Sequence, residues 1–459
     1  MLRWKNMLRL FKQQQPHSFW QRYRASKNAQ TGTILVILIL LILLVSPFFI
    51  KLYPQHHQED EKPETMVNAT VNSIVAQVLI DENTNGWDSK YHGILINWRR
   101  DDLTKVNCSP TQCDVRGQST RHDGMNDLRD LENLYWYKYR HPGDSSMDQY
   151  IARILPTVKQ EWENTTLAKG WIYYLLLRLA TYSNDANYWN QMAEHWAQVQ
   201  YQTIDTRLGL HHGPVDTVAG PGSVRLQDAY RVDLDLEIGT ALVDAGTRYH
   251  HAEWIAAGQR EVSTVIRETF STTYHLFSRI YLVYDPKYGA NKIIDYQARM
   301  GEAGQEIEAL IRTGAYTHTH SYLALAQEMI DALQSLALHD RVYGGFNLKI
   351  YLGPYRKHQA GQIDSSLKEA RQLHVLGAVH LANRVFNNKW AAIENEMLHL
   401  ATTPHKLFLP APAPGFTYGL QRNWALHPCQ TCSPNPTENW DSAEADNIAL
   451  EALQSVLSA

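Results

Sequence analysis

The chain has 459 residues and a formal net charge of −4. Its first thirty residues contain seven Lys or Arg residues and no Asp or Glu, so the remainder carries a net charge of about −11. Strong nonspecific binding to nucleic acid requires a basic face, and this composition therefore predicts no nucleic-acid partner.

Residues 34–50 form an apolar run that is interrupted only by Ser46 and Pro47. A helix needs roughly 20 apolar residues to cross a bilayer, and a basic flank stays on the cytoplasmic side. No Ala-x-Ala cleavage site follows, which favours an uncleaved signal anchor over a cleaved signal peptide. We predict a cytoplasmic basic segment over 1–32, a transmembrane signal anchor over 33–50, a polar stalk over 51–65 and an extracellular domain over 66–459.

The predicted extracellular domain shows the apolar spacing of amphipathic helices. In the segment that begins at Gly301, for example, Ala303, Ile307, Leu310 and Ile311 share one stripe. Eleven helices are predicted in this way, near residues 121–140, 148–163, 170–182, 187–204, 225–249, 251–270, 301–316, 320–339, 365–387, 389–402 and 439–457. Short connections join consecutive helices into five antiparallel hairpins and leave the final helix without a partner.

The connections between hairpins are longer and are rich in aromatic residues, Gly and Pro. They cover residues 208–223, 271–299, 341–364 and 403–438. Because each hairpin returns the chain to the same side, we expect these loops to gather where the first helix of each hairpin begins. Loops of this length are usually functional or disordered, and their aromatic content argues against disorder. A helical repeat scaffold is disfavoured because no fixed repeat period is visible.

Four local sequences accompany this series of hairpins. They are Leu134-Tyr-Trp-Tyr-Lys-Tyr139, Trp171-Ile-Tyr-Tyr174, Arg341-Val-Tyr-Gly-Gly-Phe346 and Asn439-Trp-Asp-Ser-Ala-Glu444. Together the pattern resembles the six-hairpin, (α/α)6-toroid glycosidase-like superfamily over about residues 66–459, although no single family's catalytic motif matches residue by residue. The resemblance implies an all-α toroid whose inner ring of helices surrounds a pocket. It also implies a glycoside hydrolase, sugar epimerase or polysaccharide lyase.

On this fold the first turns of the inner helices would carry the site. The inner helices would begin near Arg121, Gly170, Val224, Gly301, Ser365 and Asn439. Ionisable residues near these positions are Asp123, Asp127, Asp228, Asp233, Asp235, Glu302, Glu306, Lys368, Glu369, Arg371, Asp441 and Glu444. Any one of these carboxylates is also compatible with a routine capping role at a helix N-terminus.

Glycoside hydrolysis needs one protonated and one ionised carboxyl group on either side of the scissile bond. Glu302 and Glu306 lie one helical turn apart, beside two glycines, and are the first catalytic candidates. Asp123 and Asp228 are the candidates for the opposite carboxylate. Asp233 and Glu444 are equally compatible with that role.

Aromatic residues with a polar atom suit a sugar ligand, and the chain contains 13 Trp and 25 Tyr but only 10 Phe. Large helical domains also use Tyr at helix interfaces. The loop aromatics expected to contact sugar are Tyr343, Tyr351, Tyr355, Phe416, Tyr418, Trp424 and Trp440. Within this set, Tyr343, Tyr355, Trp424 and Trp440 are the principal substrate-binding candidates, together with Arg371.

The histidines give no metal-binding pattern, because His318 and His320 lie at a predicted turn without a third ligand nearby. There is also no Gly-rich phosphate cradle, so no metal or cofactor is expected. An epimerase or lyase would use a proton-transfer group such as His211, His212 or His318. A noncatalytic domain that binds glycan or a cell-envelope partner is the alternative to an enzyme.

Four cysteines form two close pairs, Cys108 with Cys113 and Cys429 with Cys432. Outside the membrane, disulfides are expected. The first and last hairpins of a toroid are neighbours, so the resemblance implies that the two pairs meet and close the ring. A structural zinc site with four cysteine ligands is the competing possibility.

Overall fold

The computed structural model describes residues 66–89, 92–95, 97–99, 124–163, 165–217, 224–410, 413–416, 420–425 and 440–457. All of them belong to one compact unit, Thr65–Ala459. No helix within the described ranges is long and apolar enough to cross a membrane. The predicted anchor and stalk, Asp123 and the four cysteines lie outside these ranges. The anchor and the disulfides therefore stay predictions.

Twelve α-helices are present in the described residues. They are α4 (Met66–Thr84), α5 (Gly124–Arg140), α6 (Asp148–Trp162), α7 (Gly170–Tyr182), α8 (Ala186–Thr203), α9 (Val232–Tyr249), α10 (Ala252–Thr269), α11 (Met300–Thr317), α12 (His320–Ser335), α13 (Leu373–Val385), α14 (Ala391–Thr402) and α15 (Ala443–Leu457). A short 3-10 helix, η1 (Ala370–Gln372), leads into α13.

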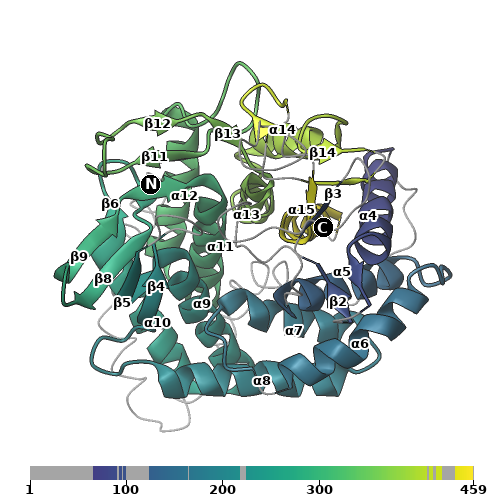
Figure 1. Ribbon diagram of the computed structural model, residues 1–459. Helices are drawn as coiled ribbons and strands as arrows, with labels where there is room; N and C mark the ends of the chain where they lie inside the picture. Colours follow the sequence, from purple (N-terminus) through teal and green to yellow (C-terminus); the bar gives the residue numbers. More distant parts are fainter. Residues whose placement is uncertain are drawn as a thin grey trace, which may run out of the picture. The chain divides into compact units, whose positions relative to one another are not determined.

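The helices form two concentric rings (Figure 1). The inner ring contains α5, α7, α9, α11, α13 and α15, and each packs on the next, with α15 returning to α5. The outer helices α6, α8, α10, α12 and α14 each pack on the inner helix that precedes them. The sixth outer position is taken by α4, which packs on α15. This arrangement is an (α/α)6 toroid.

Helix α4 corrects the prediction that the final helix has no partner. Its buried residues Val71, Val75, Val78 and Leu79 follow helical spacing, so the apolar signal was present in the sequence. A hydrogen bond also joins the two ends of the domain, because Nδ2 of Asn447 in α15 donates to Oε1 of Glu82 in α4 at 2.8 Å. The first and last helices of the domain therefore form one hairpin that local spacing does not reveal.

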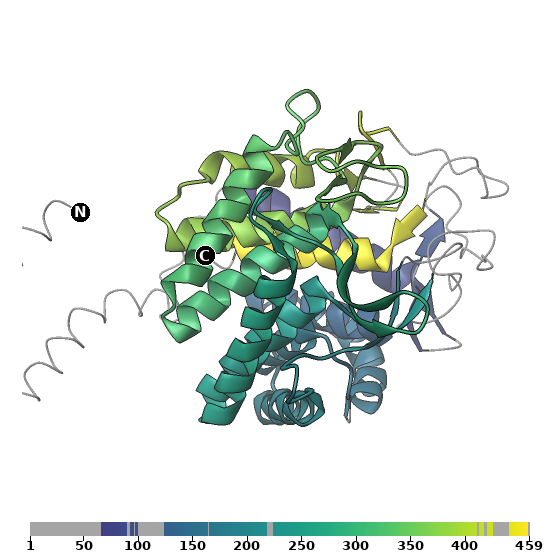
Figure 2. The same cartoon turned by 90° about the vertical axis from the view of Figure 1, so that its left-hand side faces the viewer.

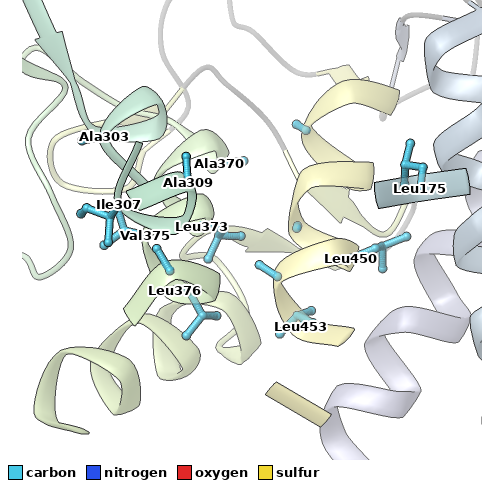
Figure 3. Close-up of a cluster of buried hydrophobic side chains, with 14 of the residues drawn as sticks. Leu175, Ala303, Ile307, Ala309, Ala370, Leu373, Val375, Leu376, Leu450 and Leu453 are labelled. Carbon is cyan, nitrogen blue, oxygen red and sulfur yellow. The ribbon is translucent and has the colours of Figure 1, made fainter. Parts of the chain in front are cut away.

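Burial differs between the two rings. Inner helix α9 is buried at nearly every position from Val232 to Gly246, whereas outer helix α10 buries one stripe that includes Trp254, Val262 and Val265. Figure 3 shows buried side chains of α7, α11, α13 and α15 in the resulting core. Helices that are buried on all sides need partners on all sides, which the closed ring supplies.

Short strands occupy the connections between hairpins, and in the side view they gather at one end of the helices (Figure 2). They are β1 (Trp87–Asp88), β2 (Gly93–Ile94), β3 (Asn97–Arg99), β4 (Gly213–Asp216), β5 (Arg225–Arg231), β6 (Phe270–Ser271), β7 (Leu276–Phe277), β8 (Ile280–Asp285), β9 (Gly289–Asp295), β10 (Gln297–Arg299), β11 (Lys349–Tyr351), β12 (Ile363–Asp364), β13 (Leu367–Lys368), β14 (Phe408–Leu409), β15 (Gly415–Phe416), β16 (Leu420–Gln421) and β17 (Trp440–Ser442). The largest sheet has four antiparallel strands in the order β4-β5-β8-β9.

These strands correct two predicted helix starts. The helix predicted over 225–249 begins only at Val232, because residues 225–231 pair with β4 and β8 and bury Leu226 and Ala229 against β8. The helix predicted over 365–387 begins at Leu373, after β13 and η1. In both places tertiary pairing overrides a local helical pattern.

Glycines allow the closest helix contacts. A Cβ atom at Gly258 in α10 would collide with the carbonyl oxygen of Gly239 in α9 and lie 2.9 Å from the amide nitrogen of Val243. Both obstacles are backbone atoms and have little freedom to move. The α9–α10 hairpin therefore requires glycine at this crossing.

We predict that Gly258→Ala lowers the free energy of unfolding by about 1–3 kcal/mol, the usual cost of overpacking a core. Gly143→Ala is the matched control, since a Cβ atom at Gly143 would meet nothing within 4 Å. Denaturant titration of both full-length variants measures the difference. Equal midpoints for the two variants would contradict the proposed close packing.

Candidate active site

A cavity of about 940 Å³ lies at the end of the ring where the inner helices begin. Its lining includes Asn126 of α5, Trp171 of α7, Asp233 of α9, Glu302 of α11 and Glu444 of α15. The volume is within the range of small-molecule sites, roughly 300–1,000 Å³. The first turns of the inner helices thus meet around one cavity.

Four consecutive inner helices are preceded by a basic residue that lines this cavity. Lys169, Arg231 and Arg299 are the N-cap residues of α7, α9 and α11, and Arg371 lies in η1 before α13. The N-terminus of a helix carries a partial positive charge, so this position is unfavourable for a cation. Nearby carboxylates offset part of that cost.

Glu302 is a buried carboxylate held by arginines. Its Oε1 atom lies 2.9 Å from Nε of Arg279 and 3.2 Å from Nη2 of Arg231. Burial alone would raise the pKa of Glu302, but the positive charges of Arg279, Arg231 and Arg299 lower it to about 2. Glu302 is therefore ionised at neutral pH.

Arg231 connects two helices through their carboxylates. Its Nη2 atom contacts both Glu302 of α11 and the carboxylate of Asp233 in α9, and its Nε atom donates to Oδ1 of Asp233 at 3.1 Å. Since one nitrogen touches both side chains, the two carboxylates lie on either side of a single guanidinium group. The cavity lining thus contains two carboxylates, Asp233 and Glu302, that share the guanidinium group of Arg231.

Asp235 has the opposite protonation state. Burial, with the nearby charges of Glu261 and Asp233, raises the pKa of Asp235 well above its usual value. Its side chain is only 4% exposed, it lines the cavity, and its Oδ1 atom has no hydrogen-bond partner within the described residues. Burial and these charges favour the neutral carboxylic acid of Asp235, which makes this cavity-lining side chain a candidate proton donor.

His211 is a buried histidine that lines the same cavity as Asp235. Nδ1 of His211 lies 2.7 Å from Oε1 of Glu261, and the backbone amide of His211 donates to the same oxygen at 3.0 Å. Although burial opposes it, Glu261 raises the pKa of His211. Glu261 also raises the pKa of Asp235, so His211 and Asp235 both respond to the same carboxylate.

The other predicted carboxylates lie apart from the cavity wall. Glu306, one turn after Glu302, is buried, and burial together with Asp233 and Glu302 raises its pKa well above the usual value. Asp228 lies on β5 rather than in a first helical turn, and its carboxylate contacts Nδ1 of His212. Neither lines the cavity, whereas His212 does. The catalytic roles of Glu306 and Asp228 stay predictions.

Arg371 lines the cavity as predicted, and its Nη2 atom lies 2.5 Å from Oε1 of Glu444 across the α13–α15 side of the ring. His374, which was not predicted, lines the same cavity. Burial and the charges of Arg129 and Arg371 lower the pKa of His374 to about 3, so its imidazole is neutral. His318 caps the C-terminal end of α11, away from the helix start that meets the cavity.

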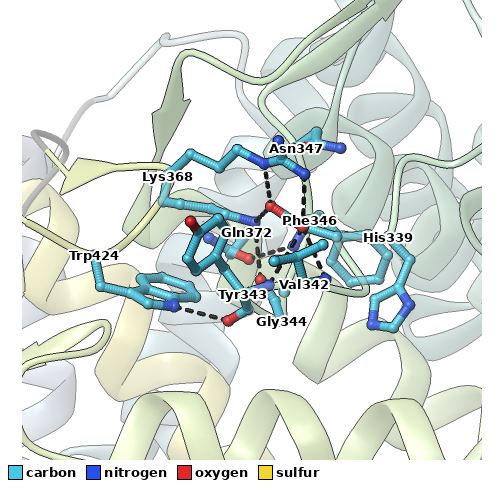
Figure 4. A network of polar contacts seen from close by, with 12 residues as sticks. His339, Val342, Tyr343, Gly344, Phe346, Asn347, Lys368, Gln372 and Trp424 are labelled. Carbon is cyan, nitrogen blue, oxygen red and sulfur yellow. Dashed lines mark hydrogen bonds and ion pairs between the residues drawn. The ribbon is translucent and has the colours of Figure 1, made fainter.

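The predicted loop aromatics Tyr343 and Trp424 belong to a separate buried network (Figure 4). Nε1 of Trp424 donates to the carbonyl oxygen of Tyr343 at 2.8 Å. Nζ of Lys368, which is fully buried, lies 3.2 Å from Asp340 and donates to the carbonyl oxygen of Gly344 at 2.8 Å. Burial lowers the pKa of Lys368 to about 8. This network shapes the 341–346 loop and does not line the cavity.

The remaining predicted aromatics also lie outside the cavity lining or outside the described side chains. Tyr355 stacks on Tyr351 with ring centroids 6.2 Å apart, and Phe416 is buried against Phe408. Trp440 belongs to β17 by its backbone, and Tyr418 lies outside the described residues. The aromatic residues that do line the cavity are Trp171 and Tyr230. The cavity lining therefore gives no support to the predicted contacts between these loop aromatics and a sugar.

Several buried polar atoms at the cavity have no hydrogen-bond partner among the described residues. They are Nδ2 of Asn126, Oε1 of Gln200, the hydroxyl of Tyr230 and Oδ1 of Asp235. Unpaired buried polar groups are costly, so these atoms mark the cavity-lining residues as strained in their present arrangement. The described residues contain no group of three or more His, Cys, Asp or Glu side chains arranged to hold a metal ion.

Similar folds occur among solved structures. An unsaturated glucuronyl hydrolase specific for heparin matches with a TM-score of 0.57 and 12% identity, covering 85% of this chain and 97% of that chain. A D-mannose isomerase matches with a TM-score of 0.55 and 10% identity, covering 87% and 99%. An inactive variant of an α-1,6-mannanase from Salegentibacter sp., in complex with α-1,6-mannotetrose, matches with a TM-score of 0.54 and 10% identity, covering 85% and 99%.

This chain has the six-hairpin, (α/α)6-toroid fold. The predicted resemblance to the glycosidase-like superfamily is thereby confirmed for the fold. No family model and no curated protein sequence matches the chain. Identities of 10–12% show the fold alone, so the activity has to be argued from the site.

The arginine contacts of Glu302 predict a pH-dependent contribution to stability. The folded pKa of about 2 lies below the usual 4.5, so the stabilisation is present above about pH 4.5 and is lost as the pH falls through 2. We predict that Glu302→Gln lowers the free energy of unfolding at pH 7 by about 3 kcal/mol, because buried Arg279 loses its closest carboxylate and keeps only Asp295 at 3.4 Å. The variant's stability should also depend less on pH between 4.5 and 2.

Denaturant titration across this pH range measures the effect. Glu328→Gln is the control, since the Glu328 side chain is 49% exposed beside His275. If the difference between wild type and Glu302→Gln is the same at pH 2 and pH 7, Glu302 does not hold the ionised state assigned to it.

Proposed function

We propose that the protein hydrolyses glycosidic bonds and that Asp235 is the general acid. The observation that supports this proposal is the presence of two carboxyl groups with opposite protonation states, Asp235 on α9 and Glu302 on α11, in one cavity. Pairs of titratable groups whose environments separate their pKa values typically divide the acid and base roles. Glycoside hydrolysis requires that division.

The proposed mechanism assigns one step to each side chain. Asp235 donates its proton to the oxygen of the departing sugar, and the negative charge left on it is transient because burial disfavours ionisation. Asp233 supplies the second carboxylate, because it contacts one arginine whereas Glu302 contacts two. As a base it takes a proton from the water molecule that attacks the anomeric carbon while the glycosidic bond breaks; as a nucleophile it attacks that carbon itself, and water then releases the sugar. Glu302 orients Arg231 and supplies negative charge near the positive centre that develops in the sugar.

The neighbouring structures are consistent with this proposal. One is a hydrolase of glucuronyl groups, and another is a mannanase whose inactive variant has two consecutive aspartates replaced by alanine. Asp233 and Asp235 occupy the first turn of an inner helix in this chain. Asn126, Gln200 and Tyr230 add polar side chains to the cavity lining, as a ligand rich in hydroxyl groups requires.

We predict that Asp235→Asn lowers turnover about 10²- to 10⁴-fold, the usual contribution of a positioned proton transfer. Because Asp235 is already neutral, an isosteric amide should leave the thermal midpoint nearly unchanged. The assay is a screen of the full-length protein for cleavage of nitrophenyl glycosides and of α- and β-linked oligosaccharides. Wild-type turnover should decline as the pH rises through the raised pKa of Asp235, because the acid then loses its proton. Turnover by the variant should not show this decline.

Asp148→Asn is the matched control, because Asp148 lies in the first turn of an outer helix and its side chain is 46% exposed. The control should keep wild-type turnover. Near-normal turnover by Asp235→Asn would remove Asp235 from the mechanism and pass the acid role to Glu306. Binding without any turnover by wild type would favour the noncatalytic glycan-binding alternative.

A sugar isomerase or epimerase is the second candidate, supported by His212. Nε2 of His212 lies 3.0 Å from Oδ2 of Asp205, and Nδ1 contacts Asp228, so two carboxylates orient an imidazole at the cavity wall. Proton transfer next to a carbonyl group would require one of these two contacts to open, because both ring nitrogens are occupied. Nuclear magnetic resonance spectra of free monosaccharides incubated with the protein distinguish the two reactions, since isomerisation produces no hydrolysis product.

We also propose that an N-terminal anchor holds this domain outside the cell. The support is the apolar run over 34–50 and its basic flank. Protease added to intact cells should then degrade the domain after Lys51 and spare residues 1–32. Immunoblots with antibodies against each end measure the outcome, and a protected C-terminal domain would reverse the orientation.

A further inference from the structure

The cavity lining carries more positive than negative side chains. The basic residues are Arg129, Lys169, Arg231, Arg279, Arg299 and Arg371, and the acidic ones are Asp216, Asp233, Asp235, Glu302 and Glu444. Asp235 is neutral by the argument above, which leaves four negative charges against six positive ones. The inner helices also direct the positive ends of their dipoles toward this cavity. The balance favours an anionic ligand.

Arg299 differs from the other arginines of the cavity. Arg231, Arg279 and Arg371 each form an ion pair with a carboxylate within 4.0 Å. Arg299 forms none with the described residues, and its closest polar contact is Nη2 to Oε1 of Gln297 at 3.5 Å, the limit of a hydrogen bond. Its Nε atom is buried without a partner among those residues. Arg299 thus lines the cavity with a guanidinium group whose donors the described residues leave largely unused.

A second cation lies directly across the sheet from Arg299. In the antiparallel register of β10 and β11, Arg299 faces Lys349. Like charges in opposite positions are destabilising. Burial and the charge of Arg299 lower the pKa of Lys349, which shows that the two side chains repel one another. Asp364 lies 3.6 Å from Lys349 and compensates it, whereas no carboxylate compensates Arg299 at that distance in the described residues.

We propose that the cavity takes an acidic saccharide and that Arg299 binds its carboxylate or sulfate group. This inference rests on the proposed carbohydrate function and adds the substrate class. An anionic oxygen group would use the unused donors of Arg299 and relieve its repulsion with Lys349. Arginine binds carboxylate and sulfate groups by paired hydrogen bonds, so the residue also fixes the orientation of the sugar relative to Asp235.

A purely structural role for Arg299 is the competing explanation. Arg299 lowers the pKa of Glu302 through its charge, without an ion pair within 4.0 Å. Arg279 and Arg231 already contact that carboxylate directly, so Arg299 is not needed to hold it in place. The structural explanation predicts that Arg299→Gln changes stability but leaves ligand preference as it is in wild type.

Binding measurements on the full-length protein test the proposal independently of turnover. The probes are a hyaluronan hexasaccharide, its carboxyl-reduced neutral counterpart, and heparin hexasaccharides with and without sulfate. Wild type should bind at least one acidic probe about ten- to hundredfold more tightly than the neutral one, as expected for a charge-assisted pair. The affinity should fall as salt is added. The carboxyl-reduced and desulfated probes identify which anionic group is recognised.

Arg299→Gln should remove the preference for the acidic probe, and Arg299→Lys should retain part of it. Arg267→Gln, which changes a 66% exposed side chain on α10, is the control and should behave as wild type. Equal binding of acidic and neutral probes by wild type, absence of binding to every acidic probe, or an unchanged preference in Arg299→Gln would each overturn the proposal. Preferential binding without cleavage would uphold it while refuting the proposed hydrolysis.

Discussion

The contact of Arg231 with Asp233 and Glu302 determines how the rest of the site is arranged. It joins α9 to α11, the two inner helices whose first turns carry the best-defined carboxyl groups. An unpaired charge in this environment would cost several kcal/mol, so neither helix can shift or rotate without breaking the contact. Arg279, supplied by the chain just before β8, fixes Glu302 from a third direction. The contact between Arg279 and Glu302 thereby connects the four-stranded sheet that contains β8 to α11 of the inner ring.

The same interaction explains why chemically similar side chains acquire different properties. Glu302 faces guanidinium groups and stays ionised, whereas Asp235 faces Glu261 and Asp233 and keeps its proton. The largest charge effect on each group comes from another element: Arg279 before β8 for Glu302, and Glu261 on α10 for Asp235. The position of a carboxylate along its helix therefore does not indicate its protonation state. The charged groups that face the carboxylate determine that state.

The architecture was largely predictable from the sequence because the inner and outer helices have long periodic apolar stripes. The pairing of α4 with α15 was missed because it joins the ends of the domain, and local spacing holds no information about such a partner. Glu302 and Arg371, both named as site candidates from the sequence, line the cavity, and their catalytic and binding roles stay predictions. Asp235 was noticed among the first-turn acids, yet nothing local distinguishes it from Asp228.

The loop aromatics show a different limit of sequence reasoning. Tyr343 and Trp424 have the composition of a sugar-binding loop, but buried Lys368 and Asp340 use the same loop to satisfy one another. Aromatic residues with polar atoms serve both purposes equally well. Apart from Arg371, the arginines that line the cavity were not predicted, because a basic residue at a helix N-cap contradicts the usual preference and signals function only after the facing groups are known.

The closure of the ring by α4 and α15 has a consequence for biosynthesis. Helix α4 leaves the ribosome first, and its partner is the last helix of the domain to be made, so the hydrogen bond from Asn447 to Glu82 spans nearly the whole domain. Contacts of such sequence separation form late and slow folding. Until α15 has been made, the apolar faces of α4 and α5 lack their neighbour and are open to aggregation or chaperones. The five central hairpins are able to assemble in order, but the inner ring becomes complete only after α15 has been added.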